Sequence, residues 1–128
     1  MKKNRLVIKA FPIFYPKDKY DYRVYSINEN KELANSLVEH YHRFTRIYQI
    51  DNLGNKHAGL GSFLLSYIIN EAKKRDNKWI ILELVGSEEG LKFCKRHKFN
   101  LMNDSDYAAT GYDKRSVGHE GRDFIKSL

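Results

Sequence analysis

The amino-acid sequence predicts an α/β fold, in which helices pack on a β-sheet. Three observations lead to this prediction. Residues 43–50 form a predicted strand, residues 59–75 have the spacing of an amphipathic helix, and Trp79–Val85 is an almost unbroken apolar run. Such a run is typical of an interior strand that is covered on both faces. A second helix and a short strand follow, so the central part is predicted to run strand, helix, strand, helix, strand.

The amino-terminal third is predicted to contain two strands and a helix. Residues 5–14 and 20–27 are rich in β-branched and aromatic side chains, and the turn-forming stretch between them favours an antiparallel pair. Pro12 places the end of the first strand at a sheet edge or a bend. Asn28 or Asn30 is expected to cap a helix that extends to about Tyr41. Its apolar residues share one helical face: Leu33, Ala34, Leu37, Val38 and Tyr41.

The strand over residues 43–50 is expected to present Phe44, Tyr48 and Ile50 on one face, and a loop follows it. The clearest helix begins near Gly59, and its last turn carries basic residues that suit the negative helix end. Its apolar stripe consists of Leu60, Phe63, Leu64, Tyr67, Ile68 and Ala72.

The carboxyl-terminal part follows the apolar strand. Ser87 is expected to cap a helix over about residues 88–97, with short strands at Phe99–Met102 and Tyr107–Tyr112. The tail from Lys114 is too polar for an assignment.

Composition limits the class of protein. The 128 residues (15.1 kDa) suit one domain, residues 1–128, and 41% of them are hydrophobic. The single cysteine, Cys94, excludes an intrachain disulfide and a zinc site built on cysteine pairs. His40 and His42 do not share a helix face, so no metal site is predicted. With no bilayer-length apolar run and no secretory signal, a cytoplasmic protein without a membrane partner is expected.

The net charge of +7 favours anionic partners, such as nucleic acid, a phosphorylated cofactor or an acidic protein. A lysine-rich solvated surface explains the same excess, because the charges form no long block. Exposed sheet edges and aromatic residues also make a homodimer possible.

The segment Lys56-His57-Ala58-Gly59-Leu60-Gly61-Ser62 is the motif with chemical content. A loop with two glycines opens a helix, whose first turn offers free backbone N–H groups and the positive end of the helix dipole to a pyrophosphate. The glycines let phosphate oxygens approach the main chain closely. The segment is neither a P-loop nor a dinucleotide fingerprint. The alternative explanation for the two glycines is that they only allow the helix to pack tightly on a strand.

Two motifs together resemble the GNAT superfamily of acetyl-CoA-dependent N-acetyltransferases. The family signature Arg/Gln-x-x-Gly-x-Gly/Ala is similar to Lys56–Gly61, and a second family segment, Asn-x-x-Ala-x-x-Phe-Tyr-x-x-x-Gly-Phe, is similar to Ser87–Phe99. The resemblance covers residues 43–102, about half of the chain. It implies a mixed, mostly antiparallel central sheet with splayed strands and flanking helices.

The resemblance also implies where acetyl-CoA, the co-substrate, would bind. Backbone amides of His57, Ala58, Gly59, Leu60, Gly61 and Ser62 would hold the pyrophosphate, with Lys56 and Ser87 nearby. The strand end at Tyr48–Ile50 would pair with the pantetheine arm and splay from Trp79–Val85 to make a cleft. An acceptor amine would attack the acetyl carbonyl there, polarised by a backbone N–H of the splayed strand.

The catalytic groups depart from the family pattern. Cys94 stands where the family often uses a tyrosine to protonate the departing thiolate, and its alternative role is that of a small buried apolar residue. Tyr107 and Tyr112 are further candidates for the acid. Glu83 either faces the cleft as a base or pairs with a basic residue.

Three functions follow from these observations. The first is an N-acetyltransferase that acts on a primary amine of a small molecule, a lysine, a protein amino terminus or aminoacyl-tRNA. The second is a catalytically weak GNAT-like module that binds coenzyme A or a protein. The third, a basic nucleic-acid-binding domain, rests on net charge and on the aromatic residues. The resemblance also leads us to expect helices soon after the first strand, which the predicted elements do not supply.

Overall fold

The protein forms one mixed sheet of seven strands in the computed structural model, which describes residues 5–13, 17–53, 59–112 and 122–128. The strand order is β1-β2-β3-β4-β5-β7-β6, and β4 and β5 are the one parallel pair within these residues. The strands are β1 (Leu6–Pro12), β2 (Lys19–Ser26), β3 (Lys31–His40), β4 (Phe44–Asp51), β5 (Trp79–Val85), β6 (Asn100–Leu101) and β7 (Arg122–Ser127). The helices are α1 (Leu60–Lys74), α2 (Glu88–Arg96) and α3 (Asp104–Thr110). The predicted α/β fold with a mostly antiparallel sheet is confirmed.

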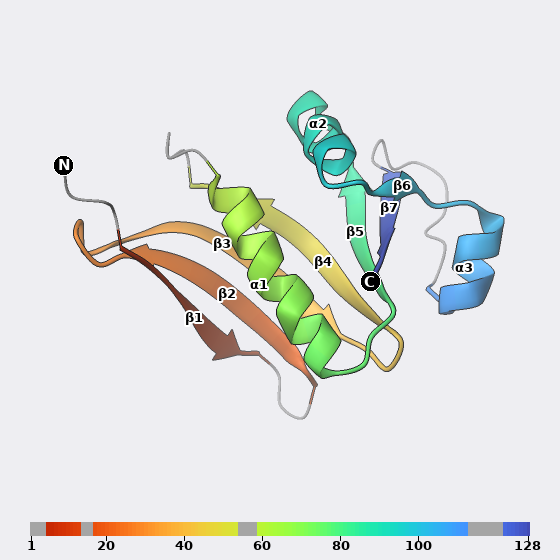
Figure 1. Ribbon diagram of the computed structural model, residues 1–128, viewed down its shortest axis with the longest axis horizontal. Helices are drawn as coiled ribbons and strands as arrows, with labels where there is room; N and C mark the ends of the chain where they lie inside the picture. Colours follow the sequence, from red (N-terminus) through yellow and green to blue (C-terminus); the bar gives the residue numbers. More distant parts are fainter. Residues whose placement is uncertain (1–4, 14–16, 54–58, 113–121) are drawn as a thin grey trace.

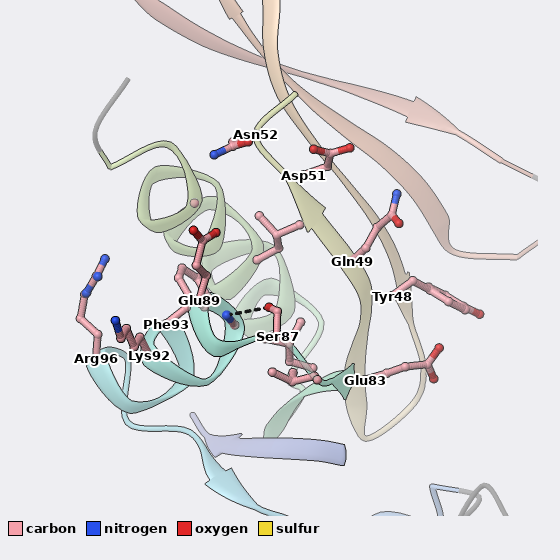
Figure 2. A pocket seen from close by; sticks show the side chains of 16 residues that line it. Tyr48, Gln49, Asp51, Asn52, Glu83, Ser87, Glu89, Lys92, Phe93 and Arg96 are labelled. Carbon is pink, nitrogen blue, oxygen red and sulfur yellow. Dashed lines mark hydrogen bonds between the residues drawn. The ribbon is translucent and has the colours of Figure 1, made fainter. Parts of the chain in front are cut away.

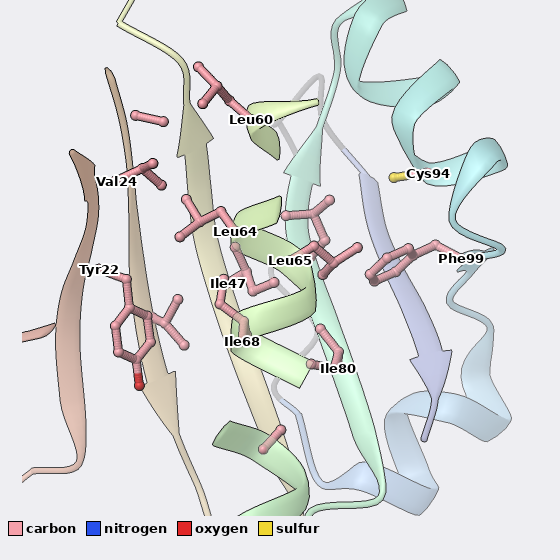
Figure 3. Packing of buried hydrophobic residues seen from close by; sticks show 14 of the residues in the cluster. Tyr22, Val24, Ile47, Leu60, Leu64, Leu65, Ile68, Ile80, Cys94 and Phe99 are labelled. Atoms are coloured by element: carbon pink, nitrogen blue, oxygen red, sulfur yellow. The ribbon is translucent and has the colours of Figure 1, made fainter. Parts of the chain in front are cut away.

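The main core lies between the sheet and helices α1 and α2 (Figure 3). Helix α1 runs across the face of β2, β3 and β4 (Figure 1). Its buried residues are Leu60, Leu64, Leu65, Ile68 and Ala72, which contact strand residues such as Val24, Ile47 and Ile80. Burial of this apolar surface is the main driving force that fixes α1, and with it the amino end of α1, against β4.

A second, smaller core lies on the opposite face of the sheet. Ile81 of β5 and Ile125 of β7 pack there with Phe44, Met102 and Tyr112. Helix α3 contributes the partly buried Tyr107. Because β5 contributes apolar residues to both clusters, its prediction as an interior strand is confirmed.

The predicted first two strands, the strand over 43–50, the helix from Gly59 and the helix capped by Ser87 are all confirmed. None of the helices within the described residues is both long and apolar enough to cross a lipid bilayer.

The helix predicted between Asn28 and Tyr41 is wrong, because these residues form a turn and strand β3. The turn at 27–30 reverses the chain with Asn30 at φ 51°, and β3 pairs with both β2 and β4. A bulge in the β2–β3 pairing places Leu33 and Ala34 side by side in the core. Beyond it, Ser36 and Val38 continue the buried face as alternate strand residues. No helix precedes α1 within the described residues.

The strand predicted at Tyr107–Tyr112 is also wrong. Asn103 caps helix α3 with a capping box, in which its side chain accepts from the Asp106 N–H while the Asp106 side chain accepts from the Asn103 N–H. Gly111, at φ 74°, ends the helix. The last strand of the sheet is instead β7, in the tail that the sequence left unassigned.

Strand β4 carries a bulge that changes the predicted sharing of faces. In the β3–β4 pairing, Val38 lies opposite Ile47 and Leu37 lies opposite Gln49, so Tyr48 is the extra residue. As a result Phe44 packs in the smaller core, while Ile50 packs against the main core on the other face. The prediction that Phe44, Tyr48 and Ile50 share one face is therefore wrong.

Candidate functional site

The candidate site is a cleft that opens where β4 and β5 separate. The pairing of β4 with β5 begins with Phe44 opposite Trp79 and ends with Ile47 opposite Leu82. The far side of β4 stays paired with β3 up to Asp51, and β5 pairs with β7. The edge of β4 that faces β5 is thus left without a strand partner over residues 48–51, within the described part of the chain.

The cleft has a volume of about 940 Å³ and lies between the splayed strands and the helices α1 and α2 (Figure 2). Both strands and both helices contribute to its wall. The lining residues are Tyr48, Gln49, Ile50, Asp51, Asn52, Gly61, Leu82, Glu83, Val85, Gly86, Ser87, Glu89, Gly90, Lys92, Phe93 and Arg96. Tyr48, Ile50, Gly61, Glu83 and Ser87 are sequence-predicted site residues that the structure brings together here.

The amino end of α1 lies at one end of this cleft. Gly59 is the N-cap residue, with φ 81°, a conformation that favours glycine. Among the described residues no side chain caps the helix, and its first turn carries no acidic residue. Within the described part of the chain, no side-chain acceptor of the usual capping kind satisfies the backbone N–H groups of this turn. Lys56, His57 and Ala58 lie outside the described residues.

Glycines allow the two helices to converge on the cleft. A Cβ atom at Gly61 would lie 3.1 Å from the Phe93 ring, and one at Gly90 would lie 2.8 Å from Val85. Gly61 therefore lines the cleft and permits close packing of α1 on α2, whereas the predicted alternative was packing of the helix on a strand. The other two motif residues in the first turn of α1 point elsewhere: Leu60 is buried in the core, and the Ser62 hydroxyl lies 2.8 Å from the His97 Nε2.

Among the described residues, helix α2 supplies the cationic side chains that line the cleft. Ser87 accepts a hydrogen bond from the Gly90 N–H and so fixes the start of the helix. One turn and two turns further on, Lys92 and Arg96 line the cleft on the same helix face. The sequence analysis missed this pair, although the four-residue spacing of two basic residues on a capped helix is a usable signal.

A buried ion pair closes the point at which the strands separate. Glu83 of β5 binds Arg46 of β4: the Arg46 Nε donates to Glu83 Oε2 over 2.7 Å, and the Arg46 Nη2 contacts the same oxygen. Tyr112 donates to that oxygen as well, over 2.5 Å. Burial, followed by the hydrogen bond to Glu83, raises the pKa of Tyr112 well above its usual range, so it stays protonated. Glu83 thus both lines the cleft and pairs with a basic residue, Arg46, and its role as a general base stays a prediction.

Tyr48 extends this polar cluster along β4. Its ring lies 4.1 Å from the Arg46 guanidinium carbon, and its hydroxyl donates to Glu39 over 2.9 Å. Tyr41 donates to the same Glu39 oxygen. In Figure 2 Tyr48 and Glu83 extend to one side of the splayed strands, whereas Lys92 and Arg96 lie on the other. The cleft therefore has a basic side at the helices and a tyrosine-rich, ion-paired side on the opposite face.

Cys94 lies away from the cleft surface. It is 1% exposed, packs in the main core, and is not among the residues that line the cleft. Burial raises the pKa of its thiol to about 11. These observations favour the packing role over proton donation. Tyr107 is directed elsewhere and donates to Asp123.

Comparison with protein-family models and with curated proteins finds no match. Comparison with solved structures finds acetyltransferases of the GNAT fold over nearly the whole chain. One is a GNAT family acetyltransferase from Elizabethkingia anophelis with acetyl-CoA bound, at 15% identity and a TM-score of 0.68, covering 98% of this chain and 100% of that one. A Bacillus subtilis acetyltransferase in complex with CoA has 14% identity and a TM-score of 0.69, covering 97% and 99%.

A third similar structure is an IAA acetyltransferase from Bacillus cereus, at 14% identity and a TM-score of 0.70, covering 97% of this chain and 100% of that one. The chain therefore has the fold of the GNAT acetyltransferases, as the sequence motifs predicted. At these identities the likeness shows the fold alone.

Proposed function

We propose that this protein is an N-acetyltransferase that moves an acetyl group from acetyl-CoA to a primary amine. The observation that carries the proposal is the cleft between β4 and β5. It joins the amino end of α1 to a strand edge, and within the described residues that end has no side-chain cap and that edge has no strand partner. Two solved structures with the same fold, from Elizabethkingia anophelis and Bacillus subtilis, are complexes with acetyl-CoA and with CoA. A long, thin, polyanionic co-substrate is the kind of ligand that such a cleft suits.

The residues present fit the parts of acetyl-CoA in order. The first turn of α1, from Gly59 to Ser62, would bind the pyrophosphate through backbone N–H groups. Lys92 and Arg96 would neutralise phosphate charge from α2. The free edge of β4 at residues 48–50 would accept amide hydrogen bonds from, and donate them to, the pantetheine arm.

The thioester would then lie at the point where the strands separate, beside Glu83. A backbone N–H of β4 would polarise the acetyl carbonyl, as a donor fixed before reaction stabilises developing charge. The acceptor would approach from the side of Tyr48, opposite the helices. Glu83 would receive the proton that the amine loses, directly or through water. Because Cys94 is buried in the core, solvent would protonate the thiolate.

A second candidate function is a module that binds coenzyme A with little turnover. It is favoured by two observations, the burial of Cys94 at the position where the family often has a tyrosine, and the pairing of Glu83 with Arg46. Both functions require acetyl-CoA binding, so they differ only in catalysis.

The test has two stages. Isothermal titration calorimetry with acetyl-CoA, and with an RNA oligonucleotide as a control for a general anion-binding surface, measures whether the cleft selects the co-substrate. Release of coenzyme A with a panel of primary amines then measures turnover. Saturable acetyl-CoA binding with amine-dependent release is expected. Binding without release supports the second candidate, and RNA binding without acetyl-CoA binding contradicts both.

A further inference from the structure

Tyr48 is the residue of β4 whose backbone the sheet constrains least. It is the extra residue of the bulge in the pairing of β4 with β3. Toward β5, the parallel pairing ends one residue earlier, with Ile47 opposite Leu82. Within the described residues, Tyr48 therefore has a Cα partner in neither neighbouring strand, although it lies at the point where β4 and β5 separate and lines the cleft.

The side chain of Tyr48 makes the contacts that its backbone lacks. Its hydroxyl donates to the Glu39 Oε1 over 2.9 Å. Its ring contacts two cations, with the Arg46 guanidinium carbon 4.1 Å and the Lys19 ammonium 4.7 Å from the ring centroid. Burial, followed by the hydrogen bond to Glu39, raises the pKa of Tyr48 above its usual range, so the hydroxyl keeps the proton that it donates.

Glu39 has a fixed position in the sheet. It lies on β3, which is paired on both sides, with Lys19 of β2 opposite it on one side and Arg46 of β4 opposite it on the other. The residue is buried, and the oxygen that binds Tyr48 also accepts from the Tyr41 hydroxyl over 2.9 Å. Hydrogen bonds to a carboxylate are roughly twice as strong as those between neutral groups, so Glu39 can hold the Tyr48 hydroxyl in one place.

From these contacts we infer that Glu39 is a positioning residue for acetyl transfer, because through the Tyr48 hydroxyl it fixes the peptide groups of the β4 bulge where the thioester would lie. The inference rests on the proposed function, in which a backbone N–H of β4 polarises the acetyl carbonyl. Such a donor stabilises the developing charge only if it is in place before the amine attacks. Glu39 acts through Tyr48 and exchanges no proton with the substrate.

Two tyrosines provide a matched pair of variants for the test. Tyr41 and Tyr48 each donate one hydrogen bond over 2.9 Å to the same Glu39 oxygen, but only Tyr48 lines the cleft. Tyr48→Phe and Tyr41→Phe each remove one of these bonds and keep the ring. If the bond to Tyr48 positions the bulge, the two variants will differ in catalysis, whereas a purely structural role of Glu39 predicts that they behave alike.

Coenzyme A release measures kcat, with the primary amine of the panel that the wild-type protein acetylates fastest. A misplacement of about 1 Å at a reacting centre can cost about a hundredfold in rate, so Tyr48→Phe should lower kcat at least tenfold. Tyr41→Phe should lower kcat less than about twofold, because its bond fixes no group of the cleft. The dissociation constant of acetyl-CoA, measured by calorimetry, should change less than about threefold in both variants, because the diphosphate contacts at α1 are unaltered.

Glu39→Gln separates positioning from proton transfer, because the amide oxygen can still accept from Tyr48 but the side chain cannot act as a base. It should retain at least about a third of kcat, with the pH profile of the wild-type protein.

Two results overturn the inference while the wild-type protein still acetylates amines. One is an equal kcat in Tyr48→Phe and Tyr41→Phe. The other is a loss of more than about a hundredfold in kcat in a folded Glu39→Gln variant, which would make the carboxylate a base. If acetyl-CoA binds and the wild-type protein acetylates no amine, the proposed function fails, and the inference fails with it.

Discussion

Reversal of the charge of the two cationic side chains on α2 should weaken acetyl-CoA binding, and the loss should depend on the salt concentration. Lys92 and Arg96 line the cleft, and both are exposed to solvent. A unit charge that acts on a phosphate across about 6 Å of water changes a binding constant about threefold. Substitution by glutamate changes the charge at each position by two units, which changes the binding constant about tenfold without screening. At 0.15 M salt the Debye length is about 8 Å, and the change in the binding constant falls to about threefold per position.

The double variant Lys92→Glu/Arg96→Glu should therefore bind acetyl-CoA about tenfold more weakly at 0.15 M salt. At 0.01 M salt, with a Debye length of about 30 Å, the loss should grow to about fortyfold. Calorimetry at both salt concentrations measures these ratios.

Lys95→Glu is the matched control for Arg96→Glu, because Lys95 is exposed on the same helix but does not line the cleft. It should change the dissociation constant less than twofold. Equal losses of acetyl-CoA affinity in Lys95→Glu and Arg96→Glu would mean that only overall charge matters. An unchanged affinity in the double variant would show that α2 is not part of the binding site.

Three further predictions concern stability and catalysis. Tyr112→Phe removes a hydrogen bond to a buried carboxylate and should lower the free energy of unfolding by about 2 kcal/mol in urea denaturation; a loss below about 0.5 kcal/mol would show that the bond to Glu83 is weak. Cys94→Ser should cost about 2 kcal/mol, because it buries a hydroxyl in an apolar cluster, yet change kcat less than tenfold; a loss of several orders of magnitude in a folded variant would show that the thiol is the acid. His40 is buried, which lowers its pKa to about 4, so the unfolded chain takes up a proton between pH 6.5 and 4 that the folded chain does not. Stability should fall by about 3 kcal/mol as pH drops through that window, and His40→Gln should flatten the profile; an equally steep profile in the variant would assign the loss to other groups.

The central part of the fold could be predicted because local and tertiary preferences agree there. The apolar spacing of α1, the continuous apolar run of β5 and the Ser87 cap each specify one structure by themselves. The likeness to a known family followed from the order of these elements and of the glycines at 59 and 61.

Strand β3 could not be predicted in the same way. Its sequence combines good helix formers with apolar residues at helical spacing, and a bulge puts Leu33 and Ala34 together in the core. Pairing with β2 and β4 overrides this local preference. Two signals were overlooked: the asparagine-rich turn before β3, and the Asn103–Asp106 capping box of α3.

The residues of the candidate site could be predicted where the backbone of one local segment places them. They could not be predicted where the site depends on contacts between side chains far apart in the sequence. Tyr48, Ile50, Gly61, Glu83 and Ser87 were expected at the cleft and line it. The contact of Glu83 with its partner joins residues 37 positions apart, and that with Tyr112 joins residues 29 apart, so neither follows from a single sequence. These contacts, rather than the glycine motif, determine the hydrogen bonding and the ion pairing of Glu83 on the side of the cleft opposite the helices.

A crystal structure of the protein with acetyl-CoA tests the central claim most directly. The account predicts that the diphosphate lies on the backbone N–H groups at the start of α1, that the pantetheine arm lies along the free edge of β4, and that the thioester lies beside Glu83. A nucleotide bound at another face, or a cleft that stays empty at saturating ligand, would contradict it.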